Sequence, residues 1–439
     1  MLIDSINEAI KKIDELSNSM PIKVISHFDT DGITSAAIMS RTLQRWNKRF
    51  SLNIVKNLEG EFIASLPENN ILIFVDLASG SLDYLKNKKC PIIIFDHHEI
   101  VQEIPENVLM INPIKTREEI ISGAGICYLF AKTLSIKNKD LANLAIIGMV
   151  GDMFEKNLGK FYDTVLTESE ALVKKGLLIY PATRSLDKAL EYSSNPYIPG
   201  VSGSYKGVIE ILKEANIQKI NGKFKSLYEL TEEEMSSLIT AVMLRCVNGK
   251  ESQNIIGNIY MIKFFNRLED ARELSALINS CSRMDSPQTA LGLCLGNKYS
   301  KDEAEKIYIQ YKQHLIAALK YVNENEKISG KNYTIFNAKD QIKDTIIGTV
   351  TSILSHSSTY EEGTILIGLA YNNDKIKVSA RLAGKNGRNV REVLHKVVVP
   401  LGGEVGGHPN AAGCLISKDH ESLFIEELKK QLETELIQV

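Results

Sequence analysis

Four short apolar runs near the N-terminus constrain the fold of this chain most strongly. All contain β-branched residues, and they read KVIS (23–26), ILIFV (71–75), PIIIF (91–95) and VLMIN (108–112). Runs without polar alternation are typical of strands buried on both faces, as in a parallel sheet covered by helices. Helical patterns accompany them over 32–46, 81–88, 123–135 and 139–149. The sequence therefore predicts an open α/β sheet.

The length of 439 residues predicts more than one domain. A stretch rich in Pro, Gly and Ser at 193–204 and ISGKN at 328–332 mark boundaries. The region between them looks mainly helical, and Thr231 and Glu234 have capping-box spacing at a helix start. We therefore predict an α/β domain over 1–160, a helical connector over 161–199, a mainly helical middle region over 200–327 and a smaller α+β domain over 328–439.

The composition gives no sign of a membrane protein or of a strongly basic one. The net charge is −2, so any phosphate-binding surface has to be local. No apolar stretch approaches the roughly 20 residues of a membrane span, and we expect no membrane segment. The six cysteines form no CxxC pair, which predicts small buried side chains in a reducing environment. We expect a cytoplasmic protein.

Acids and histidines follow three of the apolar runs directly. They are His27, Asp29 and Asp31 after the first run, Asp76 after the second, and Asp96, His97 and His98 after the third, while Asp152 ends a further segment, GMVGD (148–152). A single acid after a strand is more often a helix cap or a turn residue. However, the carboxyl ends of parallel strands meet in one crevice, where ligands bind. Together, the four segments predict one convergent site.

A mixed set of carboxylates and imidazoles predicts a divalent metal site. Such ligands suit manganese best and also tolerate magnesium, iron or zinc. The set is larger than one ion needs, whereas two ions about 3.5 to 4 Å apart, bridged by a carboxylate, would use it fully. Such a pair activates water and clamps the oxygens of a phosphoryl group. We therefore expect two divalent ions, Mn²⁺ first and Mg²⁺ second, and hydrolysis of a phosphate ester.

These motifs resemble those of the DHH phosphoesterase superfamily, which is named for the triplet found here as Asp96-His97-His98. SHFDTDGITSA (26–36) is similar to its first motif, FVD (74–76) to its second, FDHHE (95–99) to its third and GMVGD to its fourth. The resemblance implies that 1–160 is a DHH catalytic domain.

The same resemblance implies a role for each residue of the motifs. One ion would be held by His27 and Asp29, the other by Asp31, His97 and Asp152, with Asp76 as the bridge. His98 would lie beside the reacting phosphate as a hydrogen-bond donor or general acid. Asp96 would orient the histidines.

The C-terminal region resembles the DHH-associated substrate domain. Its signature appears as LGGEVGGHPNAAG (401–413), and the resemblance implies that phosphate contacts come from Gly406, Gly407, His408 and Asn410. Ser379 and Arg381 in KVSARLA match another position of the family, with Arg381 as a phosphate clamp. The region 328–439 is therefore expected to bind substrate.

Three further stretches resemble the archaeal RecJ-like single-strand nucleases. They are ISGAGICYLF (121–130), NPYIPGVSGS (195–204) and LINSCSRMDSPQTALGLCLGN (277–297). Arg283 in the last stretch is a candidate contact to a nucleic-acid strand. Arg388 lies in a basic stretch, GKNGRNVREVLHK (384–396), next to the glycine-rich signature, and is a second candidate. For both arginines, an ordinary solvated or salt-bridged position is an equal alternative.

Three functions follow from these predictions. The first is a metal-dependent exonuclease on single-stranded DNA or RNA, acting in DNA repair or replication or in RNA turnover. The second is a phosphodiesterase for short oligonucleotides, cyclic dinucleotides or nucleotide bisphosphates; the added middle region favours the longer polymer. The third is a replication subunit bound to GINS or other components of the replicative helicase. Intact metal motifs argue against a purely structural role, and a nuclease that also binds GINS remains an alternative.

Overall fold

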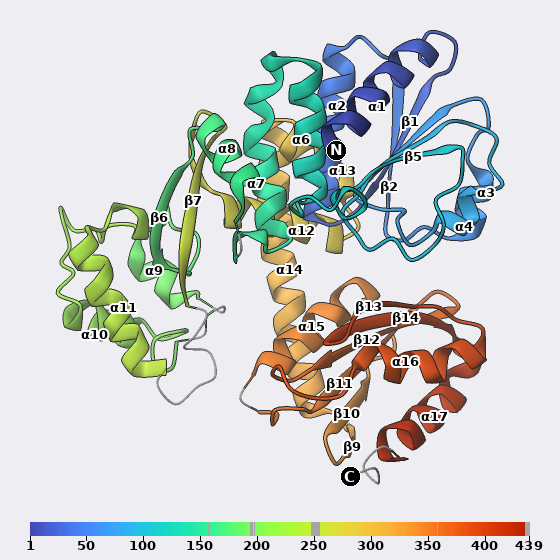
Figure 1. The fold of residues 1–439 in the computed structure, drawn as a ribbon. Helices are drawn as coiled ribbons and strands as arrows, with labels where there is room; N and C mark the ends of the chain where they lie inside the picture. The colour runs from blue at the N-terminus through green and yellow to red at the C-terminus, as the bar shows by residue number, and fades with distance from the viewer. Residues whose placement is uncertain (157, 194–195, 197, 247–254, 358, 435–439) are drawn as a thin grey trace. The chain divides into compact units, whose positions relative to one another are not determined.

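The N-terminal sheet of the computed structural model is parallel throughout, which confirms the predicted α/β class. The structure describes all residues except 157, 194–195, 197, 247–254, 358 and 435–439. The sheet has the order β2-β1-β3-β4-β5 (Figure 1). Its strands are β1 (Ile22–His27), β2 (Phe50–Val55), β3 (Ile71–Val75), β4 (Ile92–Phe95) and β5 (Val108–Ile111).

Helices cover both faces of this sheet, which explains why its strands are apolar. Val24, Ile73 and Ile93 pack on one face in a core shared with α1, α2, α6 and α7. Ile25 and Phe74 point to the other face, where they pack with α3 and α4. The helices are α1 (Leu2–Leu16), α2 (Thr30–Arg45), α3 (Gly60–Ser65), α4 (Leu82–Leu85), α5 (Pro113–Thr116), α6 (Gly123–Leu134) and α7 (Ala142–Gly151).

The strand order has a reversal point between β1 and β3. From β1 the chain moves to β2 on one side and then crosses to β3, β4 and β5 on the other. In open α/β sheets, ligands bind at the carboxyl ends of the strands beside such a point. The sheet therefore brings the segments that follow β1, β3 and β4 to one edge.

The region after α7 contains a second, antiparallel sheet of the order β6-β7-β8. Its elements are α8 (Lys160–Glu168), β6 (Leu172–Leu177), α9 (Leu186–Glu191), α10 (Tyr205–Glu214), α11 (Glu232–Cys246), β7 (Ile256–Phe264) and β8 (Arg267–Asp270). The predicted helical connector thus contains a strand. β6 is an edge strand with lysines at its centre, so its local pattern does not reveal its pairing with the distant β7. Helices α9, α10 and α11 complete a separate core.

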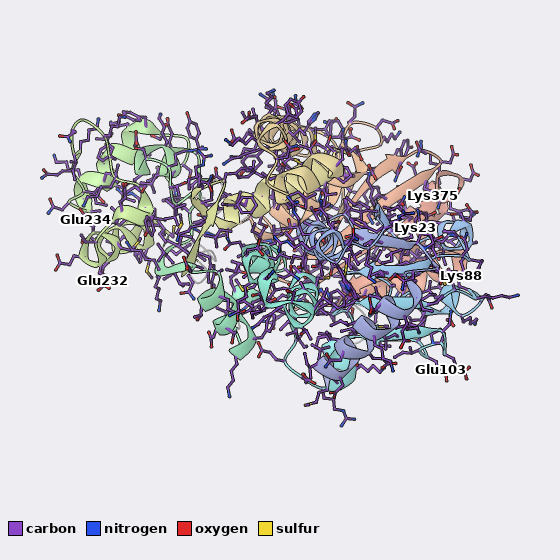
Figure 2. The ribbon with its side chains drawn as sticks, turned by 90° about the horizontal axis from the view of Figure 1, so that it is seen from above. Lys23, Lys88, Glu103, Glu232, Glu234 and Lys375 are labelled. Atoms are coloured by element: carbon purple, nitrogen blue, oxygen red, sulfur yellow. The ribbon has the colours of Figure 1, made fainter. Side chains whose placement is uncertain are left out.

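The predicted helix start at Thr231 is confirmed. Glu234 N donates to Thr231 Oγ1 at 3.2 Å, and Thr231 N donates to Glu234 Oε2 at 2.8 Å. These two hydrogen bonds form the reciprocal capping box. Glu232 and Glu234 lie together in the first turn of α11, where negative charge is favoured by the helix dipole (Figure 2).

The chain next returns to the first core. Helices α12 (Ala271–Arg283) and α13 (Pro287–Cys294) pack with α2 and α7. Thr30 Oγ1, at the start of α2, donates to the backbone oxygen of Ser275 in α12 at 3.1 Å. Helix α14 (Lys298–Glu324) follows. The described chain divides into two compact units, Met1–Tyr308 and Ile309–Val439. The boundaries at 160, 199 and 327 stay predictions.

The C-terminal unit is a six-stranded mixed sheet with helices on both faces. Its order is β13-β14-β12-β11-β10-β9, and only β10 and β11 run parallel. The elements are β9 (Ile328–Gly330), β10 (Tyr333–Asn337), α15 (Asp344–His356), β11 (Ile365–Asn372), β12 (Lys375–Leu382), α16 (Val390–Val398), β13 (Val405–His408), β14 (Ala411–Ser417) and α17 (Glu421–Thr434). The predicted α+β architecture of this region is confirmed.

The cysteines and helices agree with the sequence patterns. All six cysteines are buried and remain thiols, as expected of small core residues. Within the part of the chain that the structure describes, no helix is long and apolar enough to cross a membrane.

Candidate active site

The turn between β1 and α2 carries the first cluster. Asp29 caps α2, because its Oδ1 accepts the N–H of Gly32 at 3.0 Å. Its Oδ2 lies 2.9 Å from His27 Nδ1. Ser26 Oγ donates to the carbonyl of Gly32 at 2.6 Å and ties the strand end to the helix. Asp29 therefore has two roles. It caps the helix, and it pairs with His27 in the predicted convergent site.

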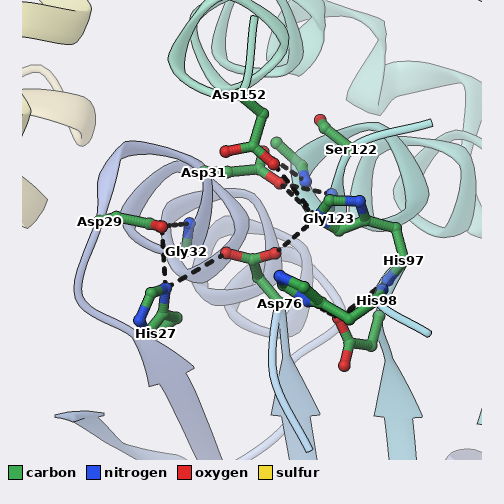
Figure 3. Close-up of polar contacts among 12 residues, drawn as sticks. His27, Asp29, Asp31, Gly32, Asp76, His97, His98, Ser122, Gly123 and Asp152 are labelled. Carbon is green, nitrogen blue, oxygen red and sulfur yellow. Dashed lines mark hydrogen bonds and ion pairs between the residues drawn. The ribbon is translucent and has the colours of Figure 1, made fainter. Parts of the chain in front are cut away.

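Asp76 leaves β3 in a left-handed backbone conformation with φ +59°. This region is uncommon for residues other than glycine, although aspartate and asparagine tolerate it better than most. The turn aims the carboxylate between two histidines. Oδ2 lies 3.8 Å from His27 Nδ1, and Oδ1 lies 3.2 Å from His97 Nε2 (Figure 3). Each oxygen of Asp76 thus faces a different histidine, which is the position a bridging ligand needs.

The third group surrounds His97. Its Nε2 lies 3.1 Å from Asp152 Oδ2 and 3.9 Å from Asp31 Oδ2. Asp152 sits just past the end of α7, and Asp31 lies in the first turn of α2 and is fully buried. Asp31 also accepts backbone N–H groups from the start of α6, at 2.5 Å from Gly123 and 3.0 Å from Ala124.

Asp96 and His98 form a pair beside this group. Asp96 is fully buried, and its Oδ1 lies 2.7 Å from His98 Nδ1. The same carboxylate accepts the backbone N–H groups of His97 (2.8 Å) and Ser79 (2.9 Å). An ionised carboxylate only accepts, so His98 Nδ1 carries the proton, and its Nε2 is left for another partner. The His98 side chain is 52% exposed, which leaves it open to a ligand.

Burial and mutual repulsion control the protonation of these carboxylates. Burial, followed by the charge of Asp152, raises the pKa of Asp31 to about 7. Burial, with the charges of Asp31 and Asp29, raises the pKa of Asp76 well above its usual range. Burial also acts on Asp96, but its bonds to His98 and neighbouring donors outweigh it and lower the pKa. Asp31 and Asp76 therefore lack sufficient positive charge around them.

The donor atoms fit divalent cations. Three overlapping groups, each with donor atoms within 4.8 Å of one another, contain Asp76; they are His27, Asp29 and Asp76; Asp31, Asp76, His97 and Asp152; and Asp76, Asp96, His97 and His98. His27 Nδ1, Asp76 Oδ1 and His97 Nε2 are buried without a hydrogen bond of good geometry. Buried polar atoms are normally satisfied. A cation near them would satisfy all three, since carboxylates and imidazoles suit manganese and related ions.

Most of the predicted substrate residues of the C-terminal unit lie on two strands that β14 separates. Ser379 and Arg381 are on β12, while Gly406, Gly407 and His408 are on β13, with β14 between them. Gly407 has φ +118°, and an added Cβ would collide with the backbone of Ala411. His408 is exposed, whereas Ser379 is buried. Asn410, in the turn after β13, accepts the N–H of Leu382 through its backbone oxygen at 2.9 Å.

The two remaining arginines of the predicted site have different surroundings. The Arg388 guanidinium donates to the backbone oxygens of Leu432 (2.8 Å) and Gln431 (3.0 Å). It therefore binds the last turn of α17, where the helix dipole favours a cation, and this contact supports the structural alternative. Arg283 instead lies over the ring of Phe28, 5.3 Å from its centroid. Burial raises the pKa of Asp29, but His27, the Gly32 N–H and, to a smaller extent, the charge of Arg283 outweigh it and lower the pKa, so Arg283 borders the site.

Three groups at the site were not predicted from the sequence. The backbone N–H groups of Gly123 and Ala124 bind Asp31, and Gly148 in α7 packs against the same carboxylate. The available signals were the small-residue run in ISGAG (121–125) and the glycines of GMVGD (148–152), and neither indicates a contact with Asp31. Almost every residue type has a backbone N–H group, so the sequence does not reveal which of these groups bind a side chain. Glycine is too common in loops to be assigned a role by itself.

Three family models match the chain. They are the DHH family, N-terminal domain, over 21–149, the DHH-CID domain over 180–259 and the DHHA1 domain over 330–434. The fold and the cluster of acids and histidines agree with the first of these matches. This chain belongs to the DHH family of phosphoesterases.

Within that family, the chain is RecJ-like. It is 30% identical to an uncharacterized protein of Methanocaldococcus jannaschii over 97% of this chain and 96% of that protein. It is 26% identical to the single-stranded-DNA-specific exonuclease RecJ of Bacillus subtilis, but this match covers 33% of the chain and 21% of that protein.

Two solved structures share the fold over nearly the whole chain. A crystal structure of exonuclease RecJ bound to manganese matches with a TM-score of 0.61 and 16% identity, covering 98% of this chain and 94% of that one. CDC45 from Entamoeba histolytica matches with a TM-score of 0.66 and 12% identity, covering 98% of each chain. At these identities the likeness concerns the fold.

The buried site predicts a stability that depends on pH and on divalent ions. The pKa of Asp31 is about 7 in the folded chain against ~3.9 when unfolded, and that of His97 is about 9 against ~6.5. For His97, burial lowers the pKa, but its pairing with Asp152 and the charges of Asp31 and Asp96 outweigh this effect. The folded state thus binds additional protons. The stability that these protons contribute is lost as pH rises through about 7 for Asp31 and through about 9 for His97.

We therefore expect the melting temperature of chelator-treated protein to fall between about pH 6 and pH 8. Mn²⁺ replaces the missing positive charge, so it should raise the melting temperature more at the higher pH. Differential scanning fluorimetry with EDTA or Mn²⁺ at both pH values measures these melting temperatures. In EDTA, Asp31→Asn should reduce the fall of the melting temperature between the two pH values. An equal Mn²⁺ shift at both pH values would count against the account.

Proposed function

We propose that this chain is a metal-dependent phosphodiesterase that degrades single-stranded nucleic acid from an end, with water as the nucleophile. The observation that carries the proposal is the position of Asp76, with one carboxylate oxygen toward His27 and the other toward His97. One divalent ion would be held by His27 and Asp29, a second by Asp31, His97 and Asp152, and both by Asp76. A bound pair, with Mn²⁺ first and Mg²⁺ second, would supply an activated water and neutralise charge on phosphoryl oxygens.

In this proposal His98 is the general acid that donates a proton to the leaving oxygen. Asp96 holds His98 Nδ1, which leaves Nε2 of this half-exposed side chain for another partner. The hydrogen bond to Asp96, against a smaller effect of burial, raises the pKa of His98 and favours a protonated ring near neutral pH. A protonated Nε2 is suited to donate to a phosphoryl oxygen and to pass its proton to the departing oxygen. Asp96 acts by orienting this ring.

Single-stranded nucleic acid is the substrate class that fits best. The sequence relatives include an exonuclease whose name specifies single-stranded DNA, and one structural relative is an exonuclease bound to manganese. With a net charge of −2, strand binding has to rely on local groups. We assign the phosphate contacts to Arg381, Ser379 and His408 of the C-terminal unit, and to Arg283 beside the metal centre.

A second proposal concerns partners of the enzyme. The fold likeness to CDC45 supports a role in the replication machinery, with GINS or helicase components as candidate partners. The complete set of acids and histidines favours an enzyme that also binds such a partner over a purely structural subunit.

Replacing the bridging carboxylate tests the metal assignment. Asp76→Asn keeps the shape of the side chain but removes the charge shared between the two groups of ligands. Loss of a partner that only orients a ligand costs ~10- to 100-fold, so we expect cleavage to fall by at least about 100-fold. In EDTA the melting temperature should not fall, because the substitution relieves repulsion with Asp31.

Asp302 is an exposed carboxylate of α14. Asp302→Asn is therefore the control and should leave cleavage unchanged. Full activity of Asp76→Asn with Mn²⁺ would refute the metal assignment.

The length of the preferred substrate separates polymer degradation from the small-substrate alternative. We expect faster Mn²⁺-dependent cleavage of a single strand of about 40 nucleotides than of one of about 5, because a longer strand reaches more binding contacts. Strands labelled at one end and resolved on a gel also reveal whether mononucleotides are released stepwise. Preference for the short substrate, or for a cyclic dinucleotide, would instead support the small-substrate phosphodiesterase.

Arg381 and Arg388 of the C-terminal unit provide a matched pair. Arg381→Gln should raise KM for the strand by about tenfold, because a charge-assisted phosphate contact is worth about 1.5 kcal/mol. Arg388→Gln should lower the melting temperature but leave KM unchanged, since its guanidinium binds the end of α17. Steady-state kinetics and thermal melts on both variants are needed. A larger KM effect from Arg388→Gln would reverse the two assignments.

A further inference from the structure

We propose that the first turn of α6 is a positioning element that sets the metal affinity of the site by fixing Asp31 and Asp76 together. The inference rests on the proposed metal centre and extends it to residues without ligand chemistry. Gly123 is the principal member, because it contacts both carboxylates, which come from different segments of the chain.

The first contact is through backbone donors. Gly123 N donates to Asp31 Oδ2 at 2.5 Å, and Ala124 N donates to Asp31 Oδ1 at 3.0 Å. The next N–H of the helix, that of Gly125, is taken by the side chain of the N-cap Ser122 at 3.2 Å. The first N–H groups of a helix have no partner within it, and its dipole favours an anion there. Asp31 fills this position, so its carboxylate plane is fixed at both oxygens.

The second contact is steric. A Cβ on Gly123 would lie 2.7 Å from Asp76 Cβ and 2.8 Å from Asp76 Oδ1. A Cβ on Gly148, in the neighbouring helix α7, would overlap with Asp31 Oδ1 and with Ala124. Both positions therefore require glycine for close approach. Helix α6 thus packs directly against Asp76, and α7 packs directly against Asp31.

The consequence is a preorganised pair of ligands. Each carboxylate oxygen of Asp31 accepts one N–H group from the start of α6. Asp31 Oδ2 also lies 3.9 Å from His97 Nε2. The residue is fully buried, so neighbouring protein groups are its partners. Groups that orient metal ligands typically change metal affinity by ~10- to 100-fold. The start of α6 has this function for two carboxylates simultaneously.

Gly123→Ala tests the inference, with Gly125→Ala as the matched control on the same helix. The added methyl group at 123 would displace Asp76, whereas at 125 it would meet the ring of Phe161 and the hydroxyl of Tyr162, each at 3.1 Å. We expect Gly123→Ala to weaken Mn²⁺ binding by about tenfold or more. Gly125→Ala should stay within about twofold of wild type. Titration followed by the EPR signal of free Mn²⁺ measures binding without reference to activity.

Cleavage kinetics provide a second readout. In Gly123→Ala, the Mn²⁺ concentration for half-maximal rate should rise, and saturating Mn²⁺ should recover much of kcat. Because Mn²⁺ also stabilises the folded chain, a thermal melt in EDTA has to show that the variant is folded before the ion is added. If Gly123→Ala does not fold, Ser122→Ala removes only the cap of the Gly125 N–H and should weaken Mn²⁺ binding by a smaller factor.

The outcomes separate this inference from the proposed function. Wild-type protein that binds no Mn²⁺ overturns the metal centre itself. Wild-type protein that binds Mn²⁺ while Gly123→Ala, or Ser122→Ala in its place, binds equally well overturns only the role of α6. An equal loss of Mn²⁺ affinity in Gly123→Ala and Gly125→Ala would also overturn this role, because any disturbance of the helix would then have the same effect.

Discussion

Repulsion among buried carboxylates is the constraint on which the rest of this structure depends. Asp31, Asp76 and Asp96 are almost fully buried within one crevice, and Asp29 and Asp152 border them. Asp96 is held ionised by His98 and by backbone N–H groups, which lower its pKa. Burial, followed by the charges of neighbouring carboxylates, raises the pKa of Asp31 and of Asp76. A divalent cation would complete the arrangement, since it adds the missing charge where the two carboxylates meet.

The fold holds these groups together through elements that the sequence separates widely. The strand order places the ends of β1, β3 and β4 side by side at the reversal point of the sheet. The left-handed turn at Asp76, the cap at Asp29 and the start of α6 then aim the side chains. Secondary structure thus provides the location, and backbone hydrogen bonds provide the orientation.

Much of this was predictable because its signals are local. The apolar runs identified four of the five strands of the N-terminal sheet but not β2, and the acids and histidines after three of these runs identified the convergent cluster. The capping box at Thr231 identified the start of α11. Other features depend on distant partners. Strand β6 was hidden because it pairs with β7 far along the chain, and Arg388 belongs to α17 although its neighbours in sequence suggest a nucleic-acid contact. The support that Gly123 gives to Asp31 comes from the backbone, which residue identity does not reveal.

Anomalous X-ray scattering from crystals soaked in Mn²⁺ tests the central claim most directly. The account predicts two manganese peaks, one on either side of the Asp76 carboxylate, with His27 and Asp29 at one peak and Asp31, His97 and Asp152 at the other. A chain that binds no manganese in this crevice, or one whose peaks avoid Asp76, would contradict it.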